Sequence, residues 1–188
     1  NQTEFLQQAL AYLEENHIPN PMKQGGVSHK PHAGCPGSAA RAFAAPTAAT
    51  GGPAPDATGK RPSQLSHWPV QLHLVSPNAP HYQGRDLLLA ADCTAYALGD
   101  FHKDYLQGKA LAIACPKLDS EQEVYVEKLT AMIDEAKINT LTVMIMQVPC
   151  CRGLLALAKQ AAAAAKRKVP IKCIVVGLQG DILQEEWV

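Results

Sequence analysis

The sequence contains six cysteines in 188 residues but has no C-x-x-C pair. Zinc ribbons, bacterial ferredoxin modules and thioredoxin-type redox sites all use that spacing, so their motifs are excluded. Any shared cysteine site must instead be assembled by folding from separate parts of the chain.

An excess of charge of either sign is also missing, because seventeen Lys and Arg residues balance seventeen Asp and Glu residues. Nucleic-acid-binding surfaces need clustered Lys and Arg, so nucleic acid is not expected as a partner. No apolar run approaches the ~20 residues that cross a membrane, and the first residues lack the order of a signal peptide. We therefore predict a cytoplasmic protein with reduced thiols and no membrane partner. The chain begins at Asn1 and not at Met, which leaves open whether this sequence is a piece of a longer protein.

From about residue 67 onward, apolar strand-like runs alternate with helical patterns. Strands are predicted at 70–75, 86–91, 110–114, 140–148 and 171–176, and helices at 94–106, 120–136 and 152–166. Strands that alternate with helices form parallel sheets with right-handed crossovers. The expected fold is an α/β domain with an open, mostly parallel sheet of about four or five strands flanked by helices.

The first third of the chain has a different composition. Apolar residues at positions 5, 6, 9, 10 and 13 predict an amphipathic N-terminal helix over residues 3–15. Residues 39–62 are rich in Ala, Pro, Gly and Thr, which predicts a flexible tether. We therefore divide the chain into an N-terminal helix with a cysteine-containing loop (1–38), a flexible linker (39–66) and an α/β domain (67–188).

Four cysteines follow predicted strands. Cys93 comes after residues 87–91 and Cys115 after 110–114, while the adjacent Cys150 and Cys151 lie between a strand and the 152–166 helix. Because the carboxyl ends of parallel strands meet at one edge of a sheet, we expect these thiols to lie close together. The positive end of the last helix favours thiolates there. Clustered thiolates bind soft metals and iron–sulfur clusters.

The remaining two cysteines are treated separately. Cys173 lies in the middle of a predicted strand and is expected to be a small core residue. Cys35 lies in the loop 34–37 and either completes the site or is spare. The candidate ligands for the four corners of a cluster are therefore Cys93, Cys115 and Cys150, with Cys151 and Cys35 competing for the last corner.

Polar residues near the strand ends have simpler interpretations. Asp119 is expected to be the N-cap of the 120–136 helix, which has further acids in its first turn. His102 could donate a hydrogen bond to a cluster or replace a cysteine ligand, although a surface histidine near a helix start is the simpler interpretation.

Several longer motifs resemble those of one protein family. They are Gly34-Cys35-Pro36-Gly37-Ser38, Trp68-Pro69-Val70-Gln71-Leu72, Ala91-Asp92-Cys93, Gly99-Asp100-Phe101-His102, Cys115-Pro116-Lys117-Leu118-Asp119 and Val148-Pro149-Cys150-Cys151. Over almost the whole chain, the sequence is similar to the C-terminal α/β module of ferredoxin-like iron–sulfur proteins from anaerobes. The resemblance implies a cluster, most simply 4Fe-4S, held by these cysteines, and electron transfer in anaerobic metabolism. It also implies a redox partner protein or a ferredoxin module as the partner.

The chain departs from this family at two points. The ferredoxin module is missing, and the family's Cys-Cys-Gly-Gly appears as Cys150-Cys151-Arg152-Gly153. Arg152 would raise the potential of an anionic cluster or hold a partner, or it would hinder close approach of the backbone. The sequence does not decide between an electron carrier and an enzyme with an open iron site.

Two interpretations without a cluster stay open. In one, Cys150 and Cys151 act as a vicinal dithiol that binds soft metals or exchanges with disulfides. In the other, zinc stabilises an interaction domain. A homo-oligomer is compatible with each of these interpretations.

Overall fold

The computed structural model describes residues 7, 11–12, 14–15, 17, 41–42 and 61–188. The chain divides into two units, Asn1–Pro36 and Gly37–Val188. Residues 7, 11, 12, 14 and 15 are helical, while the rest of the predicted 3–15 helix lies outside the described residues, as does Cys35. In the second unit, β1 (Arg41–Ala42) pairs antiparallel with β2 (His67–Trp68). Most of the predicted 39–66 linker also lies outside the described residues.

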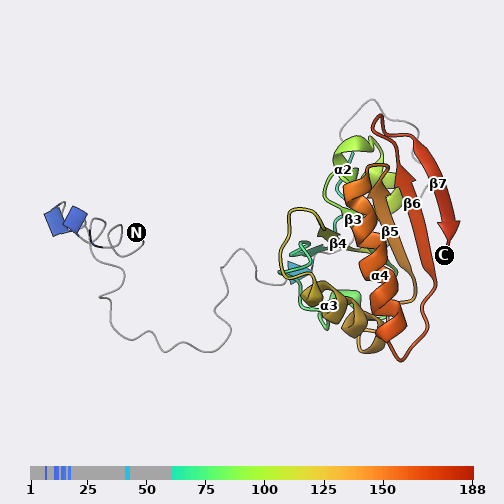
Figure 1. The fold of residues 1–188 in the computed structure, drawn as a ribbon, viewed down its shortest axis with the longest axis horizontal. Coiled ribbons are helices and arrows are strands. Elements are labelled where there is room, and N and C mark those ends of the chain that lie inside the picture. The colour runs from blue at the N-terminus through green and yellow to red at the C-terminus, as the bar shows by residue number, and fades with distance from the viewer. Residues whose placement is uncertain (1–6, 8–10, 13, 16, 18–40, 43–60) are drawn as a thin grey trace. The chain divides into compact units, whose positions relative to one another are not determined.

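A five-stranded sheet forms the centre of the second unit (Figure 1). Its order is β4-β3-β5-β6-β7, and β7 is antiparallel to β6 while the other neighbours are parallel. The bounds are β3 Leu87–Ala91, β4 Ala110–Ala114, β5 Leu141–Met146, β6 Ile171–Val176 and β7 Ile182–Trp187. The predicted α/β class with an open, mostly parallel sheet is confirmed.

Helices connect the parallel strands. The chain runs from β4 to β5 through α3 (Glu123–Asp134) and from β5 to β6 through α4 (Arg152–Ala164). These two helices pack against each other on one face of the sheet (Figure 1). Between β3 and β4 lie α2 (Thr94–Ala97) and the π-helical turn η3 (Phe101–Leu106). Because crossovers are right-handed and this connection runs across the sheet in the other direction, α2 and η3 lie on the opposite face.

Burial follows from this layering. Every residue of β3 and β5 is buried, as expected for central parallel strands that are covered on both faces. On α3 the buried residues Tyr125, Leu129, Met132 and Ile133 recur at helical spacing. Burying each such large side chain fully contributes ~1.5–3 kcal/mol. No helix among the described residues is long and apolar enough to cross a membrane.

Residues 70–75 do not form the strand that their alternating pattern predicts. Only Gln71 makes a bridge with β4, to Ile113, and the chain then turns back on the Gln71 carbonyl. Lys128 of α3 donates hydrogen bonds from Nζ to the carbonyl oxygens of residues 72, 73 and 75, at 3.1, 2.5 and 2.9 Å. A lysine therefore satisfies the carbonyl groups that a neighbouring strand would otherwise bind.

Three other element predictions need correction. The predicted 94–106 helix is interrupted, because α2 ends at Ala97 and η3 begins at Phe101. The helix predicted at 120–136 begins later, at Glu123, and Glu121 before it has a left-handed φ of 52°. Strand β7 is absent from the predicted elements; all of its residues are exposed, so it lacks the apolar alternation of a half-buried strand.

Candidate functional site

The carboxyl ends of three parallel strands carry four of the predicted site cysteines. Cys93 follows β3 and is the N-cap of α2, and Cys115 follows β4. Cys150 and Cys151 lie after β5, in the 3-10 helix η4 (Pro149–Cys151) that leads into α4. In open parallel sheets, ligands bind outside the carboxyl ends of the strands, where the strand order reverses. Here that position lies between β3 and β5, because β4 is added on one side of β3 and β5 on the other.

Three of the thiols are close enough to affect one another. Cys93 and Cys150 are exposed, whereas Cys151 is buried. Burial raises the pKa of the Cys151 thiol, a backbone hydrogen bond at Met146 lowers it, and the neighbouring Cys150 and Cys93 raise it. Cys150 and Cys151 are also adjacent in the chain. The thiols that follow β3 and β5 are therefore neighbours.

Cys115 reaches the same edge from β4. Its side chain is half-buried, and the next residue, Pro116, lies against the first turn of α4. A Cβ atom added to Gly153 would lie 3.2 Å from Pro116 Cβ, which is closer than ordinary van der Waals contact. The absence of a side chain at Gly153 therefore lets the Cys115 loop approach the segment that carries Cys150 and Cys151.

Asp119 does not cap the helix as predicted. The N-cap of α3 is Gln122, and no side chain caps that end. Asp119 Oδ2 instead accepts hydrogen bonds from the Cys115 backbone N–H at 2.7 Å and the Tyr125 hydroxyl at 2.5 Å. The Gln71 side-chain amide is a third donor, at 3.3 Å. The signal for this role in the sequence is the four-residue spacing of Cys115 and Asp119, which suits a tight turn as well as a helix start.

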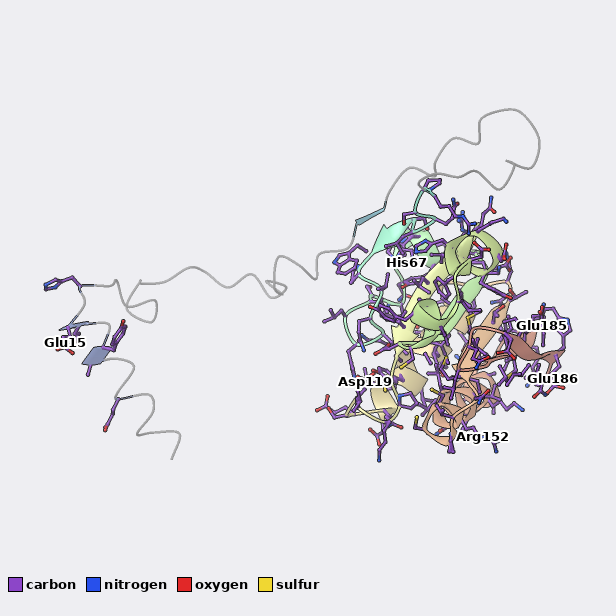
Figure 2. The ribbon with its side chains drawn as sticks, turned by 90° about the horizontal axis from the view of Figure 1, so that it is seen from above. Glu15, His67, Asp119, Arg152, Glu185 and Glu186 are labelled. Carbon is purple, nitrogen blue, oxygen red and sulfur yellow. The ribbon has the colours of Figure 1, made fainter. Side chains whose placement is uncertain are left out.

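A second carboxylate, Asp92, lies close to Asp119 at this edge. Burial raises the pKa of Asp92, and the negative charge of Asp119 raises it further. Burial also raises the pKa of Tyr125, as does its hydrogen bond to Asp119. The edge thus combines sulfur donors with two carboxylates: Asp119 is hydrogen-bonded, whereas the buried Oδ1 of Asp92 has no hydrogen-bond partner among the described residues. Figure 2 shows Asp119 and Arg152, which lie near the starts of α3 and α4, on the same side of the molecule.

The four thiols have the donor chemistry of an iron–sulfur site. Within residues 61–188 and the few described residues before them, no group of three or more His, Cys, Asp or Glu side chains is arranged to hold a metal ion. Cys93 and Cys150 are exposed, so their side chains are accessible to a ligand from solvent. The thiols are therefore the type of donor that an iron–sulfur cluster requires, and the cysteine side chains would have to reorient to bind one.

Two other predictions concern residues outside this group. Cys173 is buried in β6, which confirms its assignment to the core. His102 lies in η3, where its Nδ1 accepts a hydrogen bond from the backbone N–H of Gln64 at 3.1 Å.

Comparison with known proteins gives two matches. A family model described as a Rossmann-like domain matches residues 79–188, which is more than half of the chain. An uncharacterized protein of Archaeoglobus fulgidus is 28% identical over 119 residues, which cover 63% of this chain and 83% of the relative. No solved structure matches significantly.

Proposed function

Because the chain belongs to the Rossmann-like domain family, we propose that its ligand lies outside the carboxyl ends of its parallel strands and is an iron–sulfur cluster. The cluster is of the 4Fe-4S type, and the function is electron transfer in the cytoplasm of an anaerobe. The observation that carries this proposal is that Cys93, Cys115 and the Cys150–Cys151 pair follow three neighbouring parallel strands, β3, β4 and β5, at the edge where the strand order reverses. The motifs shared with ferredoxin-like iron–sulfur proteins support the same assignment.

Cys93, Cys115 and Cys150 are the proposed principal ligands. The first and third are exposed and Cys115 is half-buried, so all three can turn toward a cluster at the surface of this edge. Cys151 is buried, which makes it the less accessible donor. It competes for the fourth corner with Cys35, which lies outside the described residues.

On the α4 side, the surroundings of these thiols suit an anionic ligand, while Asp92 and Asp119 add negative charge beside the Cys115 loop. Cys151 is the N-cap of α4, so the free N–H groups of a 13-residue helix begin at this edge. Asp119 anchors the Cys115 loop through its backbone N–H. The exposed Arg152 adds a positive charge beside the pair. A bound cluster would supply one-electron transfer, while the chain supplies its ligands, its charge balance and a surface for a redox partner protein or a ferredoxin module.

Iron and acid-labile sulfide analysis of anaerobically purified protein tests the proposal. We expect iron and sulfide in equal amounts, with a broad visible absorption band. Cys93→Ala, Cys115→Ala and Cys150→Ala should each lose most of the iron. Cys173→Ala is the matched control, because this cysteine is buried in β6, and it should keep the iron. Wild-type protein without iron, or equal loss of iron in all four variants, contradicts the proposal.

The adjacent positions of Cys150 and Cys151 in η4 favour a second candidate, a vicinal dithiol that binds soft metals without a cluster. The same preparation distinguishes it. Protein that contains neither iron nor sulfide, but binds a trivalent arsenical through Cys150 and Cys151, supports the dithiol. Zinc without sulfide supports a zinc-stabilised domain instead.

A further inference from the structure

Strand β7 forms one edge of the sheet in the described part of the chain. It pairs with β6 on one side, and all six of its residues are exposed. Large apolar side chains stand at both of its ends, with exposed fractions of 36% and 53% for Ile182 and Leu183 and 61% and 44% for Trp187 and Val188. An exposed edge strand with apolar side chains is a template for pairing with another strand.

The polarity of this segment is symmetric about Glu185. Two apolar residues precede Gln184 and two follow Glu186, so the pattern reads the same in both directions. In an antiparallel pair of two copies centred on Glu185, the apolar end formed by Ile182 and Leu183, which contains the bulge, would come beside Trp187 and Val188 of the second copy. Gln184 would face Glu186, which allows an amide to donate to a carboxylate.

The charge at the centre of such a pair is already compensated. Lys172 of β6 forms a salt bridge with Glu185 and lies 5.5 Å from the centre of the Trp187 ring. Two copies would therefore bring together two Glu185–Lys172 pairs and not two bare carboxylates, which would repel each other. If the two-fold axis moved to Glu186, Glu185 would face Trp187 of the second copy. If it moved to Gln184, Glu186 would face Ile182. Either shift places a charged residue opposite an apolar one.

The backbone is oriented for the same register. The Val188 N–H donates to the Ile171 carbonyl oxygen at 2.9 Å, on the β6 side. Backbone groups alternate in direction along an antiparallel strand, so Glu185 and Trp187 direct theirs away from β6. The register is regular from Gln184 to Trp187 and is interrupted by a bulge toward Ile182. Figure 2 shows Glu185 and Glu186 at the outer side of the domain.

A cavity of about 280 Å³ borders β7 on the face that carries Glu185 and Trp187. Its other lining residues include the apolar Leu88 and Ile174 and the aromatic Tyr105. A second copy would add its apolar end, Ile182 and Leu183, beside Trp187 at the open side of this cavity. We propose that two copies of this chain pair antiparallel through β7, about a two-fold axis at Glu185, to form one continuous sheet.

Sedimentation of the full 188-residue chain, under reducing conditions that prevent disulfide dimers, tests this proposal. We expect a particle of twice the 20.1 kDa chain mass that dissociates on dilution. Leu183→Asp should weaken dimerisation at least about tenfold, because it places a third carboxylate on the strand and removes an apolar contact. Leu118→Asp is the matched control, since Leu118 is an exposed leucine elsewhere, and it should leave the dimer intact.

Glu185→Pro provides a second test. The Glu185 N–H points away from β6, so proline removes a hydrogen bond between copies and leaves the ladder with β6 in place. Circular dichroism verifies that the variant is folded, and the dimer should be lost. A wild-type monomer at every concentration overturns the proposal. A dimer that survives both β7 changes, or that Leu118→Asp disrupts equally, also overturns it.

Discussion

His67 is a fully buried histidine whose ring must stay neutral. It stacks on His81 with ring centroids 4.0 Å apart, and its Nε2 accepts a hydrogen bond from the Leu111 N–H of β4 at 3.0 Å. Only an unprotonated nitrogen can accept that bond. Burial lowers the pKa of His67 from 6.5 to about 4, and the neighbouring His81 contributes to the shift.

This environment predicts a loss of stability in mild acid. Between pH 6.5 and 4 the unfolded chain binds a proton at His67 and the native protein does not. The contribution of neutral His67 to stability is therefore fully present above pH 6.5 and is lost as the pH falls toward 4. This loss lowers the free energy of unfolding by about 3 kcal/mol. Burial also lowers the pKa of His81, which acts in the same direction.

Urea unfolding at several pH values measures this effect. His67→Gln keeps an acceptor for the Leu111 N–H but does not titrate, so its unfolding free energy should depend less on pH in this range. The same change at the exposed His102 is the control and should keep the wild-type dependence. Identical pH dependence in wild type and His67→Gln would show that His67 does not cause the effect.

At the scale of elements, the turn between β6 and β7 depends on contact with α2. Gly180 has a φ of +88°, and a Cβ atom added there would lie 2.3 Å from the Ala97 carbonyl oxygen. Gly108 also has a left-handed φ, of +77°, but a Cβ atom there would meet no atom within 4 Å. Comparing an alanine substitution at Gly108 with one at Gly180 therefore separates the cost of backbone strain from the cost of steric overlap.

We expect Gly108→Ala to lower the free energy of unfolding by about 1 kcal/mol through backbone strain alone. Gly180→Ala should cost at least about 2 kcal/mol, because the Ala97 carbonyl must also move. Thermal and urea unfolding of both variants measure the difference. Equal losses would mean that the β6–β7 turn does not depend on its contact with α2.

Elements with strong periodicity could be predicted from the sequence, and the others could not. The buried residues of α3, from Tyr125 to Ile133, repeat at helical spacing, and β5 is a continuous apolar run. Residues 70–75 alternate like a strand, but Lys128 binds their carbonyl groups, a long-range contact that local pattern cannot reveal. Strand β7 has no buried face, so its pairing with β6 left no periodic signal.

At the scale of the whole molecule, the strand order decides where the cysteines meet. The prediction of thiols at the strand ends needed only the alternation of strands and helices, because parallel strands share one carboxyl edge. The structure adds the position between β3 and β5, which Cys93 and Cys150 flank. The hydrogen bond from Gln71 to Asp119 could not be predicted, since the two residues are 48 positions apart, whereas the bond from the Cys115 N–H has a local signal in the four-residue spacing.

The central claim is that thiols from different strands meet at this edge, and thiol cross-linking tests it most directly. Reduced, metal-free protein is treated with dibromobimane, which becomes fluorescent when it joins two nearby thiols, and the joined peptides are identified by mass spectrometry. We predict peptides that join Cys93 to Cys150 or Cys151. Joining of Cys150 to Cys151 alone, with Cys93 labelled singly, would contradict the account.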